Sequence, residues 1–265
     1  MKKQITKVLC GTAIVVGYFP CHAQPKADID GKDRDEGKFS ISAGAVYGTT
    51  SLTGGASLTP KWSPLFDASY ERGRFFASTE RGIGYNLVQN KIWTVGAGLA
   101  YSPKRKASSN ARLRGMGDVE ASPTVLLSAN WNPMDDFINV YGVLASATKR
   151  SNGSFLTLGA TVGFPVYGKL SGFVDLSSVL ANRSYAQTYY GVTAVQALNS
   201  GYAEFRPKRG LISTSASVGL NYELTTAWSL GASLGATRLQ GDAAKSPFIN
   251  KRTEPSASLF ANYTF

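Results

Sequence analysis

Long segments in which apolar and small polar residues alternate are the strongest constraint on the fold of this chain. From Val119 to Trp131, every second residue is apolar or proline, and almost all of the residues between them are polar. A period of two places the two sets on opposite faces of a β-strand. Similar alternation occurs at residues 39–47, 93–101, 156–164, 212–224 and 228–236. No comparable helical period is present, so the sequence predicts an all-β protein.

A soluble β-sandwich and a membrane β-barrel both alternate, so the polar face must separate them. Here that face consists mainly of Ser, Thr, Gly and Asn, whereas a water-facing sheet usually carries more Lys and Glu. The segments run about ten to thirteen residues, which suits a tilted membrane strand. Aromatic residues lie at segment ends, as in an interfacial girdle: Trp93, Tyr101, Trp131, Phe137, Tyr222 and Trp228. We therefore predict a transmembrane antiparallel up-and-down β-barrel.

The last residues support the barrel over a soluble final strand. Leu259, Ala261, Tyr263 and Phe265 alternate with more polar neighbours, and Phe265 ends the sequence. A terminal Phe with an aromatic residue two positions earlier resembles the signal by which outer-membrane barrels are recognised for assembly. Tyr263 and Phe265 are the predicted assembly signal.

The N-terminal segment is typical of an export signal. Lys2, Lys3 and Lys7 are followed by an apolar run, and Cys21-His22-Ala23 forms a small-x-Ala cleavage site. We predict a signal peptide over residues 1–23, a disordered periplasmic leader over 24–38, and an outer-membrane barrel over 39–265. The leader is rich in charge and poor in large apolar residues, so it cannot bury enough surface to fold. No other apolar run is long enough to cross a bilayer as a helix.

Turn lengths orient the barrel, because bacterial barrels keep short turns in the periplasm and long loops outside. The short turns expected are residues 89–91, 132–136, 166–169 and 225–226, and the external loops expected are 102–117, 148–154, 181–210 and 240–252. The region between Thr49 and Leu87 leaves the parity of the strand count open. We expect twelve strands, with ten as the alternative.

Removal of the signal peptide would also remove Cys10, Cys21 and His22, the only cysteines and the only histidine. The mature chain then lacks the residues of Cys/His zinc sites and of Ser-His or Cys-His catalysis. Gly231-Ala232-Ser233-Leu234-Gly235 spells G-x-S-x-G, but inside a strand and without a histidine partner. We expect no catalytic residue, no cofactor and no metal.

Charged pairs in the chain receive structural interpretations. Asp118 with Glu120 is expected on the lumen face, and Asp135 with Asp136 in a short turn, as solvated or ion-paired groups. Glu80 and Arg81 would point to opposite faces of a regular strand. Because a charge on the lipid side is costly, we expect a bulge, a strand end or a local reversal there.

Basic residues concentrate in the loops assigned to the outside. Lys104, Arg105, Lys106, Arg112 and Arg114 lie within one loop segment that holds no acidic residue. Lys and Arg suit phosphate, and lipopolysaccharide of the outer leaflet is rich in phosphate. These five residues are the candidate lipopolysaccharide contact, with a merely solvated loop surface as the alternative. Removal of the signal peptide lowers the net charge from +11 to +8, because Lys2, Lys3 and Lys7 leave with it. A basic exported chain favours an anionic membrane surface as partner and not a nucleic acid.

Four blocks of the chain resemble the MipA/OmpV family of outer-membrane proteins. They are Arg74–Thr79 with Gly82–Leu87, Arg112–Val119, Gln187–Val192 with Gln196-Ala197, and Arg238–Pro247. The region before about Pro60 departs most from the family pattern, so the resemblance says least about the first hairpin. The resemblance implies an exported barrel and, for the namesake, a scaffold that links a lytic transglycosylase to a murein synthase. It implies no catalytic residues. The expected function is a scaffold or envelope-integrity protein, with a small passive channel as the alternative.

Overall fold

The computed structural model describes residues 37–48, 61–79, 81–134 and 137–265. The predicted signal peptide, residues 24–36 of the predicted leader, Glu80, Asp135 and Asp136 lie outside these residues. All structural statements below refer to the described part of the chain.

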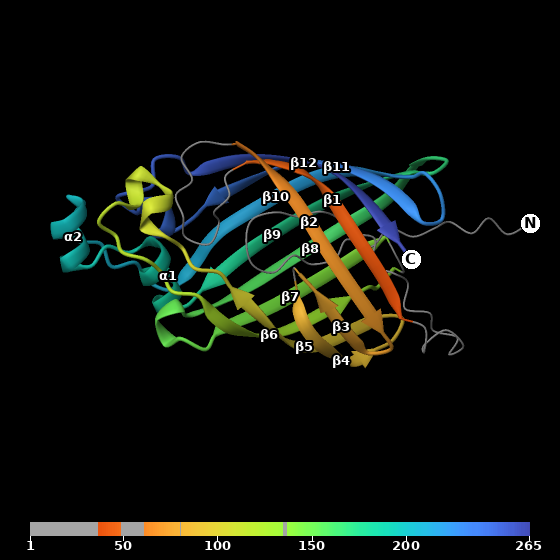
Figure 1. Ribbon diagram of the computed structural model, residues 1–265, viewed down its shortest axis with the longest axis horizontal. Coiled ribbons are helices and arrows are strands. Elements are labelled where there is room, and N and C mark those ends of the chain that lie inside the picture. Colours follow the sequence, from red (N-terminus) through yellow and green to blue (C-terminus); the bar gives the residue numbers. More distant parts are fainter. Residues whose placement is uncertain (1–36, 49–60, 80, 135–136) are drawn as a thin grey trace, which may run out of the picture.

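Twelve antiparallel strands form a closed barrel (Figure 1). Each strand pairs with its neighbours in sequence, and β1 pairs with β12 to close the sheet. The strands are β1 (Lys38–Gly48), β2 (Lys61–Arg72), β3 (Phe75–Ser78), β4 (Gly82–Gln89), β5 (Trp93–Ser102), β6 (Ser122–Trp131), β7 (Ile138–Ala147), β8 (Ser154–Tyr167), β9 (Leu170–Ala181), β10 (Gly210–Glu223), β11 (Trp228–Leu239) and β12 (Thr253–Thr264). The expected fold and the expected twelve strands are confirmed.

The alternation of the sequence separates the outside of the barrel from the inside. In β5 and β6, Leu99 and Leu127 are exposed on the outer surface, whereas Ser122 and Thr124 are buried inside. The outer surface therefore presents apolar side chains, which is the surface a bilayer requires. Backbone pairing around a closed sheet satisfies the N–H and C=O groups that lipid cannot.

The two ends of the barrel differ, because short turns lie at one end and long connections at the other (Figure 1). The long connections contain α1 (Arg183–Tyr190), α2 (Ala194–Ser200) and 3-10 helices at Ala107–Ser109, Ala111–Leu113, Arg150–Asn152 and Ala243–Lys245. By the rule for bacterial barrels, the short-turn end faces the periplasm and the long-loop end faces outward. None of the described helices has the length and apolar character needed to span a membrane.

β3 and β4 are short, and β6 begins later than the alternation of the sequence predicts. β3 has 4 residues and β4 has 8, so the hairpin that they form is shorter than the rest of the wall. β6 begins at Ser122, although the alternation of the sequence starts at Val119. Val119 instead forms an isolated bridge with Arg105 and is buried among loop residues. The alternating pattern of the sequence thus extends beyond the end of β6. There the apolar side chain of Val119 is buried by loop residues and not by a neighbouring strand.

Candidate functional site

The long loops at the outer end of the barrel, residues 103–121, 182–209 and 240–252, pack against one another as a cap. One cluster in the cap consists of Leu113, Met116, Val192 and Phe248, all of them buried and contributed by three different loops. Because these contacts join segments far apart in sequence, the loops support one another and not only their own hairpins. The cap has a hydrophobic core of its own.

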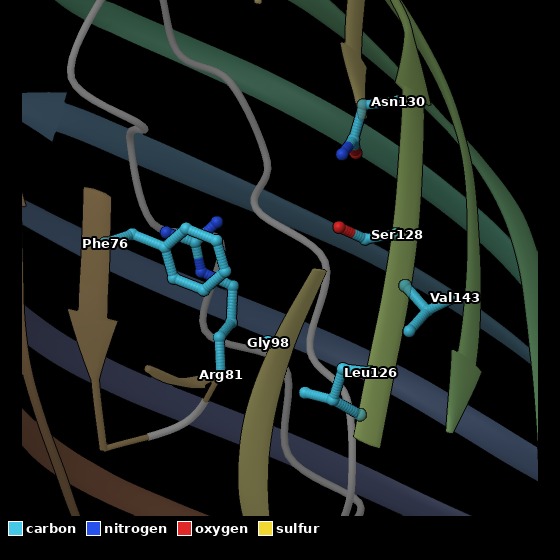
Figure 2. Close-up of a pocket in the computed structure, with 7 residues that line it drawn as sticks. All are labelled: Phe76, Arg81, Gly98, Leu126, Ser128, Asn130 and Val143. Atoms are coloured by element: carbon cyan, nitrogen blue, oxygen red, sulfur yellow. The ribbon is translucent and has the colours of Figure 1, made fainter. Parts of the chain in front are cut away.

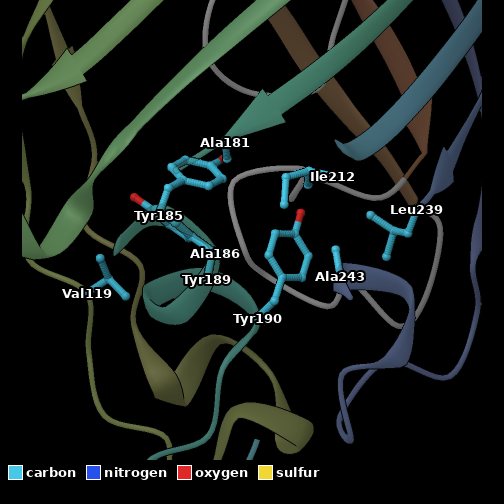
Figure 3. Close-up of a cluster of buried hydrophobic side chains, with 9 residues drawn as sticks. All are labelled: Val119, Ala181, Tyr185, Ala186, Tyr189, Tyr190, Ile212, Leu239 and Ala243. Atoms are coloured by element: carbon cyan, nitrogen blue, oxygen red, sulfur yellow. The ribbon is translucent and has the colours of Figure 1, made fainter. Parts of the chain in front are cut away.

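Helix α1 carries the aromatic part of this cap (Figure 3). Its first turn is capped by Asn182, whose Oδ1 accepts from the N–H of Tyr185 at 2.9 Å. Tyr185, Tyr189 and Tyr190 are buried, and the rings of Tyr185 and Tyr189 lie 4.5 Å apart between centroids. They pack with residues at the outer ends of the strands, among them Ile212. The helix therefore packs on the barrel end and does not extend into solvent.

Arg105 of the predicted basic loop lies inside the cap. Its guanidinium donates to the carbonyl oxygens of Thr188 and Tyr189, both at 3.4 Å, and lies 5.6 Å from the centroid of the Tyr189 ring. Burial lowers the pKa of the Arg105 guanidinium from its ordinary value. Arg105 thus joins the loop to α1, and its charge does not face outward.

Lys104 is exposed but paired. Its ammonium lies 2.8 Å from Glu120 and 3.1 Å from Asp118, and the hydrogen bonds to these carboxylates raise its pKa. The pKa of Asp118 is lowered, first by the N–H of Ala107 and then by Lys104. The expectation that Asp118 and Glu120 lie on the lumen face is wrong. Both flank Val119, which lies in the cap and not in a strand of the barrel. Their expected role as ion-paired groups agrees with these contacts.

The remaining members of the basic loop are available to solvent to different degrees. Lys106 and Arg114 are exposed, and Arg112 is half-buried. The five predicted residues therefore lie in one region of the cap, but they do not form one cationic surface. Lys106, Arg112 and Arg114 remain as the candidate residues for contact with lipopolysaccharide.

Aromatic rings on the inner face of the barrel pack over glycines of neighbouring strands. Phe260 of β12 lies opposite Gly44 and Gly231, and Phe173 of β9 lies over Gly219. These glycines have no side chain to collide with the ring, which is why glycine recurs on the polar face of the sequence.

Polar contacts inside the barrel are also paired within the protein. The carboxylate of Asp175 accepts from Thr161 Oγ1 at 2.7 Å and from Tyr141 Oη at 3.1 Å. Arg81 lies 2.7 Å from Glu71 and stacks on the ring of Phe76 at 4.7 Å. Arg81 lies in the turn directly before β4, so it occupies a strand end, as expected. Glu80 lies outside the described residues.

A pocket lies on the inner side of the β3–β4 hairpin (Figure 2). It is a small hollow with room for about one water molecule, and its lining residues are Phe76, Arg81, Gly98, Leu126, Ser128, Asn130 and Val143. Sequence reasoning did not identify this site. The signal that could have found it is Leu126, a large apolar residue on the polar face of its strand.

The predicted assembly signal lies at the short-turn end. Tyr263 packs against Trp228 and Phe265, with ring centroids 4.8 and 4.6 Å away. The N–H of Phe265 donates to the carbonyl oxygen of Phe39 at 2.9 Å. Phe265 remains exposed, so its ring is accessible in the folded barrel. Its role as an assembly signal stays a prediction.

The residues examined for catalysis lie in strands and ion pairs. Ser233 of the G-x-S-x-G sequence lies in the middle of β11, where its hydroxyl shares a hydrogen bond with Ser258 at 2.7 Å. A nucleophile elbow requires a sharp turn between a strand and a helix, and β11 makes none at this point. Among the described residues, no group of three or more His, Cys, Asp or Glu side chains is arranged to hold a metal ion.

Several solved membrane barrels are similar to this chain in outline. An outer membrane channel of Pseudomonas putida F1 has 12% identity and a TM-score of 0.42, covering 90% of this chain and 100% of that chain. The outer membrane channel DcaP of Acinetobacter baumannii has 10% identity and a TM-score of 0.39, covering 87% and 96%. The toluene transporter TodX of Pseudomonas putida has 10% identity and a TM-score of 0.41, covering 87% and 89%.

The curated proteins contain no match to this chain. A family model described as "MltA-interacting protein MipA" matches residues 41–265, which extend from β1 to the last residue. This match covers the barrel except the first three residues of β1, and it includes the cap and the short β3–β4 hairpin. The chain belongs to the MipA family of outer-membrane β-barrels.

Proposed function

We propose that this protein is a non-enzymatic scaffold that holds murein-synthesising and murein-hydrolysing enzymes at the inner face of the outer membrane. The observation that carries the proposal is the family match, whose description names an interaction with MltA. The packing of the outer loops into a cap supports it, because an ordered cap over the outer end favours a role for the surface of the barrel over a role for its interior.

Murein lies in the periplasm, so the partner must approach the short-turn end. Three consecutive turns there expose large apolar side chains: Ile92, Met134 and Tyr167. The turns are adjacent, since the N–H of Asn132 donates to the carbonyl oxygen of Ile92 at 2.8 Å. Exposed apolar and aromatic side chains of this kind form the centres of protein interfaces. We assign them as the docking face for the lytic transglycosylase.

The non-enzymatic part of the proposal rests on chemistry. The residues that could act as nucleophile or base are engaged elsewhere: Ser233 bonds Ser258 within the sheet, and the carboxylates of Asp118 and Asp175 are held by neighbouring side chains. Acid–base catalysis needs a titratable group placed in a cleft beside the reacting atoms. Ser233, Asp118 and Asp175 are instead engaged in structural contacts.

A pull-down from envelopes with the full-length barrel and a lytic transglycosylase tests the docking face. Replacement of Ile92, Met134 and Tyr167 by Ser should reduce the captured enzyme by about tenfold or more, as loss of interface anchors does. The matched control replaces two exposed apolar residues of α2, Val195 and Leu198, by Ser; capture should stay at the wild-type level. Equal capture by the triple variant and the wild type would contradict the docking face. Absence of capture by the wild type would contradict the scaffold itself.

A passive channel is the second candidate, favoured by the small polar residues that line the strands inside. The buried Ser42, Thr124, Asn221 and Asn262 show that part of the lumen is hydrophilic. Planar-bilayer conductance decides between the two functions. The scaffold proposal expects no steady conductance from the wild type. Steady single-channel steps would support the channel.

A further inference from the structure

Arg238 places a charge on the lipid-facing wall of the barrel, at the outer end of β11. It lies opposite Thr214 of β10 and Thr253 of β12, so the three side chains share one face of the sheet. That face is the outer one, because Leu234, four positions earlier, is exposed, whereas Leu239, the next residue, is buried against the cap. A lipid-facing cation is costly in the middle of a bilayer, so the depth of Arg238 decides what it can do.

The length of β11 places Arg238 at the outer membrane interface. Trp228 begins the strand at the short-turn end, where its ring packs with that of Tyr263, and Arg238 lies ten positions further along. Ten residues rise about 34 Å along an antiparallel strand, and a tilt of about 40° reduces this to about 26 Å across the membrane. The apolar band of a bacterial barrel is about 25 Å tall. The guanidinium therefore lies at the level of the head groups of the outer leaflet.

Two more cations come from the end of the loop that leads into β12. Lys251 and Arg252 are exposed and directly precede Thr253, the partner of Arg238. The carbonyl oxygen of Arg252 accepts from the N–H of Leu239 at 2.7 Å, which holds this residue beside the end of β11. Among the described residues, none of the three cations forms an ion pair with a carboxylate. Their charges are thus available to an anion from outside the protein.

Two hydroxyl groups flank the guanidinium of Arg238. Thr214 Oγ1 accepts from Gln240 Nε2 at 3.0 Å, which leaves the O–H of Thr214 to donate. Thr253 carries the second hydroxyl, on the other side. Glu254, the acidic residue next to Thr253 in the chain, takes the opposite face of β12 and lies near the buried Tyr190. A guanidinium fork between two hydroxyl groups, with two further cations beside it, matches a phosphate group.

The wall on the membrane side of this charged row suits hydrocarbon chains. Ala216, Ala236 and Pro255 occupy the next outward-facing positions of β10, β11 and β12, opposite one another in the sheet. One step further toward the membrane centre, Val218 and Leu234 are paired and exposed. An acyl chain can therefore lie against small and apolar side chains while its head group meets the cations. We propose that this face binds lipid A, the lipid part of lipopolysaccharide, through one of its phosphate groups.

This site lies on the barrel wall, whereas the candidate lipopolysaccharide contact of the basic loop lies in the cap. Native mass spectrometry of the full-length protein in detergent micelles tests it, with lipid A and chemically dephosphorylated lipid A as probes. R238Q should weaken binding of lipid A by about tenfold or more and leave binding of the dephosphorylated form unchanged. R150Q is the matched control, because Arg150 is an exposed cation of the same barrel end that does not belong to the wall. Its affinity for lipid A should equal that of the wild type.

A second pair of variants tests the acyl part of the site. A236W covers the small side chains next to Arg238 and should reduce the affinity for lipid A by about tenfold through steric overlap. A232W, on the same face of β11 but four positions further from Arg238, is its control and should bind lipid A normally. Equal losses in these two variants would overturn the position of the acyl chains.

Two further probes separate lipid A from other sources of phosphate. Inorganic phosphate should not displace lipid A, because it lacks the hydrocarbon chains. Phosphatidylglycerol should bind more weakly, because its phosphate diester carries a single charge. Equal affinity for phosphatidylglycerol, or equal binding by R238Q and R150Q, would overturn the assignment to lipid A. Heat-modifiable migration checks that each variant is folded, and R238K, which keeps the charge without the fork, should show an intermediate affinity.

Discussion

The pairing of Phe260 with Gly231 gives the sharpest test of how the lumen is packed. A Cβ at Gly231 would lie 2.5 and 2.6 Å from the Cε2 and Cε1 atoms of the Phe260 ring. Gly231→Ala should therefore destabilise the barrel by about 1–3 kcal/mol through overpacking. Phe260→Ala removes a buried ring and should cost about 3–5 kcal/mol. In the double variant the ring is gone, so the added methyl group meets no obstacle.

The two substitutions should consequently be non-additive. The double variant is expected to be about as stable as Phe260→Ala alone, which corresponds to a coupling free energy of about 1–3 kcal/mol. Urea unfolding in detergent micelles, followed by tryptophan fluorescence, measures the free energy of unfolding of all four proteins. Gly84→Ala provides the control, because Gly84 of β4 lies against the ring of Phe76 of β3 and not against Phe260. The destabilisation caused by Gly84→Ala should therefore add to that caused by Phe260→Ala. Additivity of the Gly231 and Phe260 substitutions would refute the packing described here.

Three further predictions concern the ends of the barrel. Deletion of Phe265 should lower the yield of folded protein, because β12 then loses the ring on which Tyr263 packs; normal amounts of the heat-modifiable form would contradict the assembly signal. Replacement of Lys106, Arg112 and Arg114 by Gln should leave the cap resistant to protease on whole cells while reducing lipopolysaccharide retained during purification, each charge contributing on the order of 1 kcal/mol near an anionic leaflet; equal retention at matched salt would favour a merely solvated loop. The depressed pKa of Asp118 means that its stabilising effect is complete above its unfolded value of 3.8 and is lost as the pH falls through the folded value. Cleavage of the cap by pepsin should therefore rise in the wild type as the pH falls through the folded pKa of Asp118, and it should change less in Asp118→Asn. Identical pH profiles of cleavage for the two proteins would count against the ion pair.

Much of the barrel could be predicted from local patterns. Alternation in segments such as 93–101 identifies the lipid-facing residues, because a strand turns successive side chains to opposite faces whatever its partners are. Turn lengths assigned the two ends, and the expected turns at 89–91 and 166–169 lie at the end opposite α1 and α2. The short β3–β4 hairpin was the region where the strand count stayed open, because neither strand has the length of a membrane strand.

The basic loop shows where local reasoning fails. A run of cations without an acidic neighbour predicts a solvated or phosphate-binding surface. In the structure, Arg105 is held by carbonyl groups of α1, and Lys104 is held by carboxylates that lie beyond the run. Neither contact can be read from the spacing of the five cations, because the partners come from positions that only the folded cap brings near.

The sequence by itself determined the class of fold, the apolar exterior and the direction of the chain through the membrane, since these follow from a period of two and from turn length. Tertiary structure alone decided that the outer loops form a cap, that Phe260 occupies the space left by Gly44 and Gly231, and that a pocket opens behind Phe76 and Arg81. The physical reason is that strand alternation is a local property of the backbone. The cap, the packing of rings over glycines inside the barrel and the pocket instead depend on strand register and on contacts between loops, which exist only once the barrel has closed.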